Sequence, residues 1–490
     1  MKKVLEMGVL LSAERDMDRL LDQILSCAMD LARCDGGTLY LLDGDVLRFK
    51  IMRTDSLGTR SGRDGRAPDL PPVRLSRENV CALALLEDRT ISIQDVYHAP
   101  GCDFSGPIAY DALTGYHTQS MLVVPMRGRR GERVGVLQLI NALDSQGNIC
   151  AFQEEMALVL ESLASQAAVT IQNVRYIREI RELFASFVRV MSAAVDERSP
   201  YNANHSRRMA AYGGRFLDLL NAQALAEGRE APFSPQRREE LLMSVWLHDI
   251  GKLTTPLEVM DKAERLSPMQ KAAIRQRLEV IRLCGRIDCL EGRLSPAELD
   301  ALERDTREAE ASISRMSTAG YLSDGQLAEL ERLRARTYLD GGGREQPWIT
   351  AGEYAMLSIR KGTLSSEERR IMEDHVVVTD KLLSRISFSD ELSHVRSWAA
   401  AHHELLDGSG YPAHLSGDAI PQEVRIITIL DIFDALVAED RPYKPGMPVE
   451  RALAILRDMA EREGRLDPAL TARFIESRCW ERTPEERQTP

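Results

Sequence analysis

The chain has 490 residues and a formal net charge of −12, and 44% of its residues are apolar while 28% are charged. This balance is typical of globular proteins and excludes a disordered or fibrous chain. Single hydrophobic cores rarely exceed roughly 250–300 residues, so the length predicts about three domains. The acidic charge argues against a protein that binds nucleic-acid polymers through a basic face.

The eight cysteines are scattered along the chain and include no Cys-x-x-Cys pair. This usage is typical of a reducing compartment, so we expect a cytoplasmic protein without a disulfide framework. The sequence contains no run of about 20 apolar residues, and polar residues interrupt its N-terminal segment. Neither a membrane span nor a signal peptide is therefore expected.

The first third of the chain alternates between helical and strand patterns. Residues 38–42 and 46–52 are β-rich and flank Gly44, which tolerates the positive φ of a tight hairpin turn. A second hairpin is predicted within residues 120–141, and the Gly-, Arg- and Pro-rich residues 56–72 are predicted to form a loop. The pattern predicts an α+β domain with a mostly antiparallel sheet.

Residues 154–195 predict one long helix. Apolar residues recur at spacings of three and four from Leu160 to Met191, and no glycine or proline interrupts them before Pro200. A stripe this long and narrow favours a coiled-coil seam and hence a homodimer. The alternative is a helix that packs only on its own domain.

Residues 200–480 are predicted to be almost wholly helical. Four helix starts show a serine three residues before a Glu or Gln that can bond back to a free amide. These serines are Ser267, Ser295, Ser323 and Ser365. The stretch 265–345 is dense in Arg, Glu and Leu and contains no histidine, so no chemistry is predicted there.

Seven of the nine histidines lie between residues 205 and 414, and five of them face the apolar side of a predicted helix. A single inward histidine is more often an ordinary core residue. Two inward aspartates accompany these five, however, and a buried carboxylate is costly without a compensating cation. One shared metal cluster explains all seven residues. They are His205, His248, Asp249, His375, His402, His403 and Asp431.

Seven ligands exceed the four of a structural zinc site and fit two divalent metal ions that share one carboxylate. Imidazole and carboxylate donors without thiolate favour iron or manganese. A two-metal centre suits the hydrolysis of phosphate esters, because it generates a hydroxide near neutral pH and stabilises the attacking and leaving oxygens.

Two motifs carry a family resemblance. The sequence His-Asp-Ile-Gly-Lys at 248–252 resembles the signature of HD-domain phosphohydrolases. The sequence His-His-Glu-Leu-Leu-Asp-Gly-Ser-Gly-Tyr-Pro at 402–412 is far more specific and is similar to the HD-GYP subfamily, whose members hydrolyse the bacterial second messenger cyclic di-GMP. Residues 431–436 and the Arg-Pro-Tyr-Lys run at 441–444 also fit this subfamily.

The resemblance implies roles for individual residues. The seven residues above would bind metal, with Asp249 as the bridging ligand. Lys252 would hold a phosphate oxygen, Arg441 and Lys444 would hold the phosphates or guanine edges of the substrate, and Tyr411 would line the mouth of the site. The alternatives are a solvated basic turn at 441–444 and a purely structural loop around Tyr411.

Three further positions carry expectations. Some members of the subfamily hold a third metal through a glutamate one turn before the first histidine, but this chain has Tyr201 there. The resemblance therefore favours two metals. Glu404 and Asp407 are expected to orient ligand histidines.

The first part of the chain resembles a GAF domain, a sensory module of signalling proteins. The segments that carry this resemblance are residues 36–42, 135–141 and 163–168. The Asn-Lys-x-Phe-Asp-Glu set of cyclic-nucleotide-binding GAF domains is not seen. An unknown small ligand is therefore expected, and His98, Cys102 and His117 are interpreted as unlinked surface residues.

The expected domains are a GAF-like sensory domain at 1–155, a signalling and dimerisation helix at 156–195, an HD-GYP domain at 196–480 with a helical insertion at 266–361, and a tail at 481–490. The resemblance implies hydrolysis of cyclic di-GMP under GAF control, with pGpG as the first product and further hydrolysis to GMP left open. Two alternatives stay open: a receptor that binds cyclic di-GMP without turnover, and an HD phosphohydrolase that acts on another cyclic nucleotide.

Overall fold

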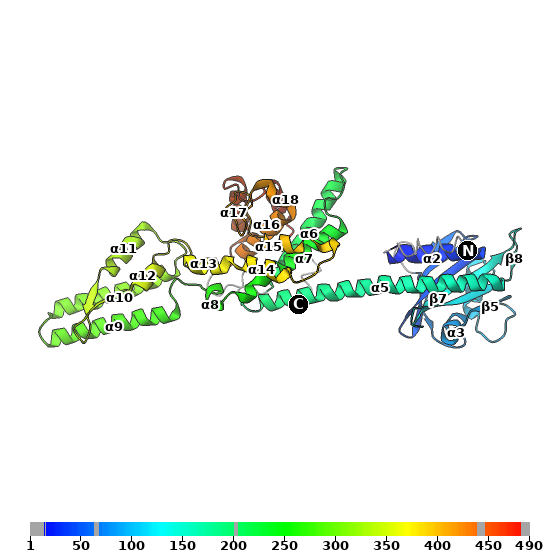
Figure 1. Ribbon diagram of the computed structural model, residues 1–490, viewed down its shortest axis with the longest axis horizontal. Helices are drawn as coiled ribbons and strands as arrows, with labels where there is room; N and C mark the ends of the chain where they lie inside the picture. The colour runs from blue at the N-terminus through cyan, green and yellow to red at the C-terminus, as the bar shows by residue number, and fades with distance from the viewer. Residues whose placement is uncertain (1–13, 15, 63–67, 200–203, 439–445, 482–490) are drawn as a thin grey trace. The chain divides into compact units, whose positions relative to one another are not determined.

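The computed structural model describes residues 14, 16–62, 68–199, 204–438 and 446–481 (Figure 1). The chain divides into two compact units, Met1–Phe184 and Ala185–Pro490, which we call the N-terminal and C-terminal units. The division falls inside one long helix, α5 (Glu154–Asp196), at the place where the sequence predicts such a helix. None of the described helices combines the length and the apolar character needed to cross a membrane.

The N-terminal unit is built on one antiparallel sheet with the strand order β3-β2-β1-β7-β6-β5, in which β4 pairs with β2 and β8 with β7. Its strands are β1 (Cys34–Asp43), β2 (Val46–Thr54), β3 (Thr59–Ser61), β4 (Val73–Arg74), β5 (Ile91–Ile93), β6 (Met121–Arg127), β7 (Arg133–Leu143) and β8 (Ile149–Cys150). Its helices are α2 (Met17–Ala32), α3 (Val80–Glu87), α4 (Ser105–Thr114) and the first part of α5. The predicted α+β class is confirmed.

Helices cover both faces of this sheet. Successive residues of a strand point to opposite faces, so Leu39 of β1 packs in a core with Leu20 of α2 and Leu160 of α5. Its neighbour Tyr40 packs in a second core with Val80 of α3. The arrangement of α2, α5 and α3 about the sheet can be followed in Figure 1.

Both predicted hairpins are present. In the first, Asp43 pairs with Val46, and Gly44 in the turn has a φ of +58°. The second joins β6 to β7. The predicted loop at 56–72 is wrong in part, because β3 lies inside it and pairs Thr54 with Thr59. Strand β3 lies at the edge of the sheet and is held by backbone hydrogen bonds to β2. Its side chains, Thr-Arg-Ser, are polar, so the apolar pattern by which strands are predicted is missing here.

The regular structure described in the C-terminal unit is helical apart from a two-stranded hairpin of β9 (Thr337–Leu339) and β10 (Glu345–Pro347), which lies in the segment predicted as helical insertion. Its α-helices after α5 are α6 (His205–Ala226), α7 (Pro235–Leu247), α8 (Leu257–Met260), α9 (Pro268–Leu290), α10 (Pro296–Thr318), α11 (Asp324–Arg334), α12 (Ala351–Leu357), α13 (Ser366–Glu373), α14 (His375–Leu383), α15 (Val395–Ala400), α16 (Gln422–Val437), α17 (Val449–Glu461) and α18 (Pro468–Ser477). Three short 3₁₀ helices join them, η1 (Ile250–Thr254), η2 (Asp390–Leu392) and η3 (Gly417–Ala419).

All four predicted capping boxes form, at the starts of α9, α10, α11 and α13. In each, the serine accepts from the amide three residues on, while the Glu or Gln there accepts from the serine's own amide. A fifth box, Thr350 with Glu353, begins α12 and was not predicted.

The C-terminal unit contains two separate cores. One includes Phe216 of α6, Phe433 of α16 and Phe474 of α18. The other is formed by segment 266–361 alone and includes Ile313 and Trp348. Because segment 266–361 buries its apolar side chains in a core of its own, it can be inserted between α8 and α13 without changing the packing of the other core.

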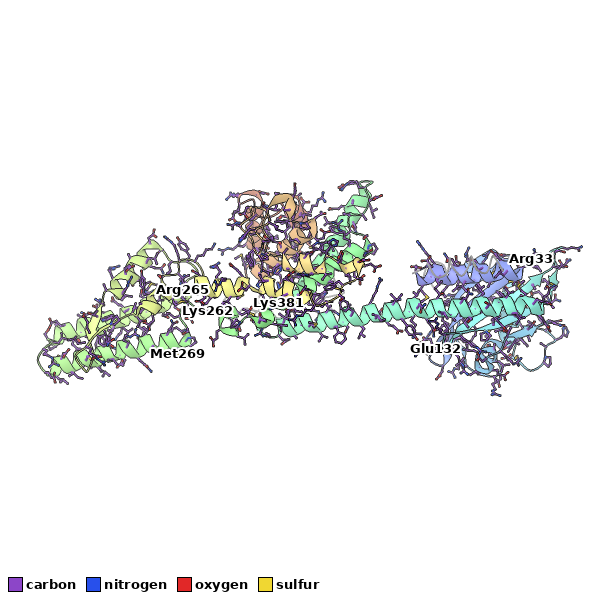
Figure 2. All side chains as sticks on the ribbon, in the orientation of Figure 1. Arg33, Glu132, Lys262, Arg265, Met269 and Lys381 are labelled. Atoms are coloured by element: carbon purple, nitrogen blue, oxygen red, sulfur yellow. The ribbon has the colours of Figure 1, made fainter. Side chains whose placement is uncertain are left out.

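The insertion is tied to its neighbours by two buried or half-buried cations, both labelled in Figure 2. The Arg265 guanidinium is fully buried and donates to the carbonyl oxygens of Met316 (2.7 Å) and Ile359 (2.8 Å). The Lys262 ammonium lies 2.6 Å from a carboxylate oxygen of Glu368 in α13. The Arg265 bonds fix the start of the inserted segment to its end, and the Lys262 ion pair joins the residues that flank it.

Candidate metal centre

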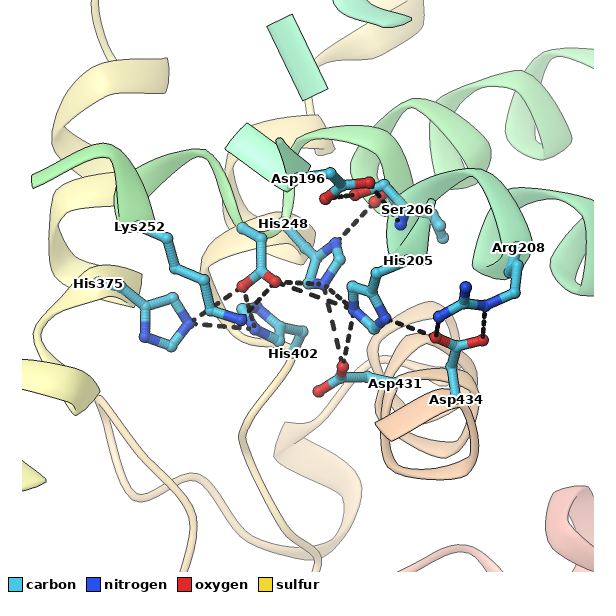
Figure 3. Close-up of polar contacts among 12 residues, drawn as sticks. Asp196, His205, Ser206, Arg208, His248, Lys252, His375, His402, Asp431 and Asp434 are labelled. Carbon is cyan, nitrogen blue, oxygen red and sulfur yellow. Dashed lines mark hydrogen bonds and ion pairs between the residues drawn. The ribbon is translucent and has the colours of Figure 1, made fainter. Parts of the chain in front are cut away.

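The seven residues predicted as ligands converge in the C-terminal unit, from elements far apart in the sequence, and Figure 3 labels five of them. They come from the start of α6 (His205), the turn after α7 (His248 and Asp249), the start of α14 (His375), the turn after α15 (His402 and His403) and α16 (Asp431). Six of the seven are buried, and His403 is half-buried. Their ligand atoms form two groups among the described residues.

The first group contains His205, His248 and Asp249, whose candidate ligand atoms all lie within 4.8 Å of one another. The Nε2 atoms of His205 and His248 are 3.3 Å apart. Oδ2 of Asp249 is 3.3 Å from Nε2 of His248 and 3.9 Å from Nε2 of His205. Asp431 closes this group, because its Oδ1 lies 3.2 Å from Nε2 of His205.

The second group contains His375, His402 and His403. The Nε2 atoms of His375 and His402 are 3.5 Å apart. Oδ1 of Asp249 lies 3.4 Å from Nε2 of His375 and 3.9 Å from Nε2 of His402. Asp249 therefore directs one carboxylate oxygen toward each group, which is the arrangement that a bridging ligand requires.

One structural observation, independent of the family resemblance, indicates that these residues suit a pair of metal ions. Oδ1 of Asp249 is buried and has no hydrogen-bond partner among the described residues. A buried carboxylate oxygen without a donor is costly, and a cation placed between Asp249 and the imidazoles of the second group would compensate it. Imidazole and carboxylate donors suit divalent iron, manganese or zinc.

Three histidines are held in the tautomer that a metal needs. The Nδ1 atom of each lies 2.6–2.7 Å from a carbonyl oxygen three residues earlier. A carbonyl only accepts, so Nδ1 carries the proton and Nε2 keeps its lone pair for a metal. These carbonyls belong to the last residues of α7, α13 and α15, where helical carbonyls lack an intrahelical partner. The pairs are His248 with Val245, His375 with Met372, and His402 with Ala399.

His205 is oriented by a carboxylate instead. Its Nδ1 lies 2.7 Å from Oδ2 of Asp434, which is fully buried. The Arg208 guanidinium donates two hydrogen bonds of 2.9 Å to the same carboxylate. Burial would raise the pKa of Asp434, but the hydrogen bonds from His205 and Arg208 hold it below its usual value.

Asp434 and Arg208 were not predicted. Each stands three residues after a candidate ligand, Asp431 and His205 respectively, and therefore on the same helix face. This spacing is the sequence signal that could have found them.

Replacing Asp434 by Asn tests this support of His205. The variant keeps the shape of the side chain but loses the charge, so His205 loses its fixed tautomer and Arg208 loses its counter-ion. Removal of such a supporting carboxylate typically costs 10–100-fold in metal affinity, and we expect a loss of about that size in Mn²⁺ affinity by calorimetric titration. Asp418→Asn, on the surface, is the matched control, and equal affinities of the two variants would contradict the role of Asp434.

Burial and neighbouring charges set the protonation of the cluster. Burial lowers the pKa of His403 to about 4 and holds the pKa of His402 well below its usual value, so both imidazoles are neutral at pH 7. Burial alone would lower the pKa of His205, but its hydrogen bonds to Asp431 and Asp434 raise it to about 10. The neighbouring carboxylates thus favour a proton on Nε2 of His205, which a metal ion bound there would displace while Nδ1–H stays on Asp434.

Lys252 and Tyr411 border the cluster. Nζ of Lys252 lies 2.6 Å from Oδ2 of Asp249. Burial would lower the pKa of Lys252, but the Asp249 and Asp431 carboxylates raise it, so the ammonium stays charged. The Tyr411 ring is 4.8 Å from the ring of His403. Both side chains are thus placed beside the candidate ligands.

The expectation that Glu404 and Asp407 orient ligand histidines is wrong. The buried Glu404 carboxylate accepts from the amides of Ala413 (2.7 Å) and Leu415 (2.9 Å). Asp407 accepts from the amide and the hydroxyl of Ser409. Both carboxylates therefore fix the fold of the loop that follows the two histidines.

The other predicted positions either fall outside the described residues or lie apart from this cluster. Tyr201, Arg441 and Lys444 fall outside the described residues. His98 and His117 are exposed, and neither they nor Cys102 belong to a metal-binding group among the described residues.

Comparisons with known proteins identify domain families and relatives that this chain resembles. The GAF domain family matches residues 16–171, and the HD domain family matches residues 350–470. The chain is 30% identical over 252 residues to "Cyclic di-GMP phosphodiesterase response regulator RpfG" of Xanthomonas campestris pv. campestris. This alignment covers 47% of this chain and 62% of that protein. It is 44% identical over 99 residues to "3'3'-cGAMP-specific phosphodiesterase 3" of Vibrio cholerae serotype O1, which covers 20% of this chain and 21% of that protein.

A solved structure, the GAF domain of a phosphoenolpyruvate-protein phosphotransferase from Coxiella burnetii, matches 36% of this chain and 95% of its own length, with 16% identity and a TM-score of 0.29. The chain spans less than two thirds of the length of the two relatives above. The matches of residues 16–171 to the GAF domain family and of residues 350–470 to the HD domain family agree with the predicted resemblance to HD-GYP proteins with an N-terminal GAF domain.

Proposed function

We propose that this chain is a metal-dependent phosphodiesterase that hydrolyses cyclic di-GMP in bacterial second-messenger signalling. The observation that carries the proposal is the position of Asp249 between two groups of imidazoles, with one buried oxygen that lacks a donor. Two metal ions, iron or manganese, would be held by the seven residues of the cluster. The names of the relatives, which include cyclic di-GMP phosphodiesterases, support this substrate class.

When bound, the two metal ions would supply Lewis acidity toward phosphate oxygens and an activated water. The chain's own residues would orient and neutralise the substrate. Lys252, charged and half-buried beside Asp249, would pair with a non-bridging phosphate oxygen. Tyr411 would line the entrance next to His403. Arg441 and Lys444, outside the described residues, are proposed to contact the phosphates or guanines, since Arg suits planar bidentate recognition.

A product assay on metal-loaded protein tests the proposal. The full chain is purified without oxygen, its metal content is measured, and cyclic di-GMP is supplied with Mn²⁺ or Fe²⁺. We expect two metal ions per chain and release of pGpG or GMP. A metal-loaded protein that binds cyclic di-GMP but never cleaves it would instead support the receptor alternative.

A second substrate is favoured by one observation. The relative that is 44% identical over 99 residues is named as specific for 3'3'-cGAMP, a mixed cyclic dinucleotide. The same assay with both dinucleotides at equal concentration decides between them. A kcat/KM at least tenfold higher for 3'3'-cGAMP would replace cyclic di-GMP as the proposed substrate.

We also propose that two copies of the chain pair along α5. Five exposed apolar residues follow a 4-3-4-3 spacing, the pattern of a coiled-coil seam. They are Tyr176, Ile180, Leu183, Phe187 and Val190, each at least 50% exposed. Water-exposed apolar side chains in such a stripe gain stability when a second helix covers them.

The double variant Ile180→Glu, Leu183→Glu is expected to be monomeric, because it places four carboxylates in the seam of a dimer. Light scattering after size-exclusion chromatography measures the mass. Arg189→Glu changes an exposed residue of the same helix outside the seam and should leave the dimer intact. A double variant that keeps the mass of two copies contradicts pairing along α5.

The GAF domain at 16–171 is proposed to bind an unknown small ligand in the cytoplasm and to regulate the HD-GYP domain at 196–480 through α5. Two residues inserted after Arg181 would rotate everything downstream by about 200° relative to the GAF domain. The insertion should abolish ligand-dependent regulation, and unchanged regulation would count against α5 as the route.

A further inference from the structure

At its C-terminal end, α5 buries one face in the C-terminal unit, which fixes the rotation of the helix about its own axis there. Val188, Ser192, Val195 and Asp196 share one helix face and are each at most 5% exposed. The neighbouring Phe187 and Val190 are exposed and belong to the proposed seam. One face of the last turns therefore packs inside the unit while another faces outward.

The last residue of α5 binds the helix that carries His205. The Asp196 carboxylate accepts from the amide (3.2 Å) and the hydroxyl (3.1 Å) of Ser206, the second residue of α6, as Figure 3 shows. Both residues are buried. The N-cap residue of α6, Asn204, makes no side-chain capping bond. Asp196 therefore satisfies a first-turn amide of α6, and its negative charge is favourable at a helix N-terminus.

Two residues later, the chain binds the element that carries Lys252. Nη1 of Arg198 donates to the carbonyl oxygen of Lys252 (2.6 Å), and Nη2 donates to that of Thr255 (3.3 Å). These carbonyls stand at the C-terminal end of η1, where that of Lys252 also accepts from the Thr255 amide (3.1 Å). Arg198 thereby fixes the backbone from which Lys252 reaches Asp249.

We propose that Asp196 and Arg198 are positioning residues, which set the places of His205 and Lys252 and pass movements of α5 to both sides of the metal centre. The proposal rests on the proposed function. The two contacts start from adjacent points at the end of one helix, so a rotation or shift of that end displaces α6 and η1 together. Neither residue touches the candidate ligand atoms, and each would act through the residue that it holds.

The test compares two variants of the full chain with matched controls. Asp196→Asn removes the charge and one of the two acceptor oxygens that Ser206 uses, and Arg198→Met removes both donors to η1 and Thr255. Glu197→Gln and Arg189→Met change exposed residues of the same stretch. Mn²⁺ affinity is measured by calorimetry and kcat on cyclic di-GMP by product assay. We expect Asp196→Asn to weaken Mn²⁺ binding at least about tenfold, because it disturbs a candidate ligand.

We expect Arg198→Met to lower kcat at least about tenfold while Mn²⁺ affinity stays within threefold, because Lys252 serves the substrate rather than the metal. In the double variant with Lys252→Met, the loss should equal that of Lys252→Met alone, since Arg198 would act through Lys252. A purely structural residue would instead give additive losses, and that result overturns the proposal for Arg198.

Further outcomes separate the two proposals. Variants that match their controls in both kcat and Mn²⁺ affinity overturn the positioning roles. A wild-type protein that binds Mn²⁺ but cleaves no cyclic dinucleotide overturns the proposed function, while the Mn²⁺ affinity of Asp196→Asn still decides the role of Asp196. If Arg198→Met unfolds, Arg198→Lys, which keeps one carbonyl contact, should show an intermediate kcat, and a wild-type kcat would refute the role.

Discussion

Replacing Asp249 by Asn is expected to abolish turnover, with kcat at least about a thousandfold lower, roughly 4 kcal/mol at 1.36 kcal/mol per factor of ten. The carboxylate lies between the two groups of imidazoles and directs one oxygen to each. Asn supplies one oxygen and no negative charge, so it cannot hold two cations. Metal analysis should accordingly find fewer than two ions per chain.

The isosteric change keeps the volume of the side chain, so the fold should survive. Far-ultraviolet circular dichroism that matches the wild type would establish this. Asp300→Asn is the matched control, since Asp300 is exposed on the insertion, and it should keep both the metals and the activity. A variant of Asp249 with wild-type kcat and two metals would show that the bridging assignment is mistaken.

Replacing Gly251 by Ala is expected to destabilise the C-terminal unit by about 2–4 kcal/mol and to weaken Mn²⁺ binding. A Cβ at this position would lie 1.9 Å from the carbonyl oxygen of His375 and 2.7 Å from the amide nitrogen of Thr379. Both atoms belong to the backbone of α14, so neither can move away alone. The clash separates η1 from α14 and with them Asp249 from His375.

The same substitution breaks a short hydrogen-bond chain. The Gly251 amide donates to the Thr379 hydroxyl, which donates to the carbonyl oxygen of His248. Denaturant unfolding measures the loss of stability, and calorimetric titration measures the Mn²⁺ affinity. Gly352→Ala is the control, because a Cβ there meets nothing within 4 Å. Equal stabilities of the two variants would contradict the close approach of η1 to α14.

Much of the fold was predictable because its signals are local. The turn at Gly44 and the serine capping boxes each involve residues no more than a few positions apart. The apolar stripe of α5 likewise depends on spacings of three and four. The edge strand β3 was missed because it pairs through its backbone while its side chains are polar.

For the site, the sequence supplied the seven candidate ligands. Helix periodicity predicted that five histidines and two aspartates face inward and share one metal cluster, and the family resemblance implied the same seven ligands. The structure places them together, and their role as ligands stays a prediction. Helix periodicity gives the direction of a side chain but not its partner, so the assignment of Glu404 to a ligand histidine was wrong.

By itself, the sequence determined the α+β and helical classes, the helix starts and the residue types of the candidate centre. Only the tertiary structure decided that Asp249 stands between two groups of imidazoles, that Asp434 orients His205, and that Arg198 holds the backbone of Lys252. His205 and Asp434 are 229 residues apart in the chain. Capping and periodicity depend on neighbours within about one helical turn, whereas such a contact depends on how α6 and α16 pack around a shared core.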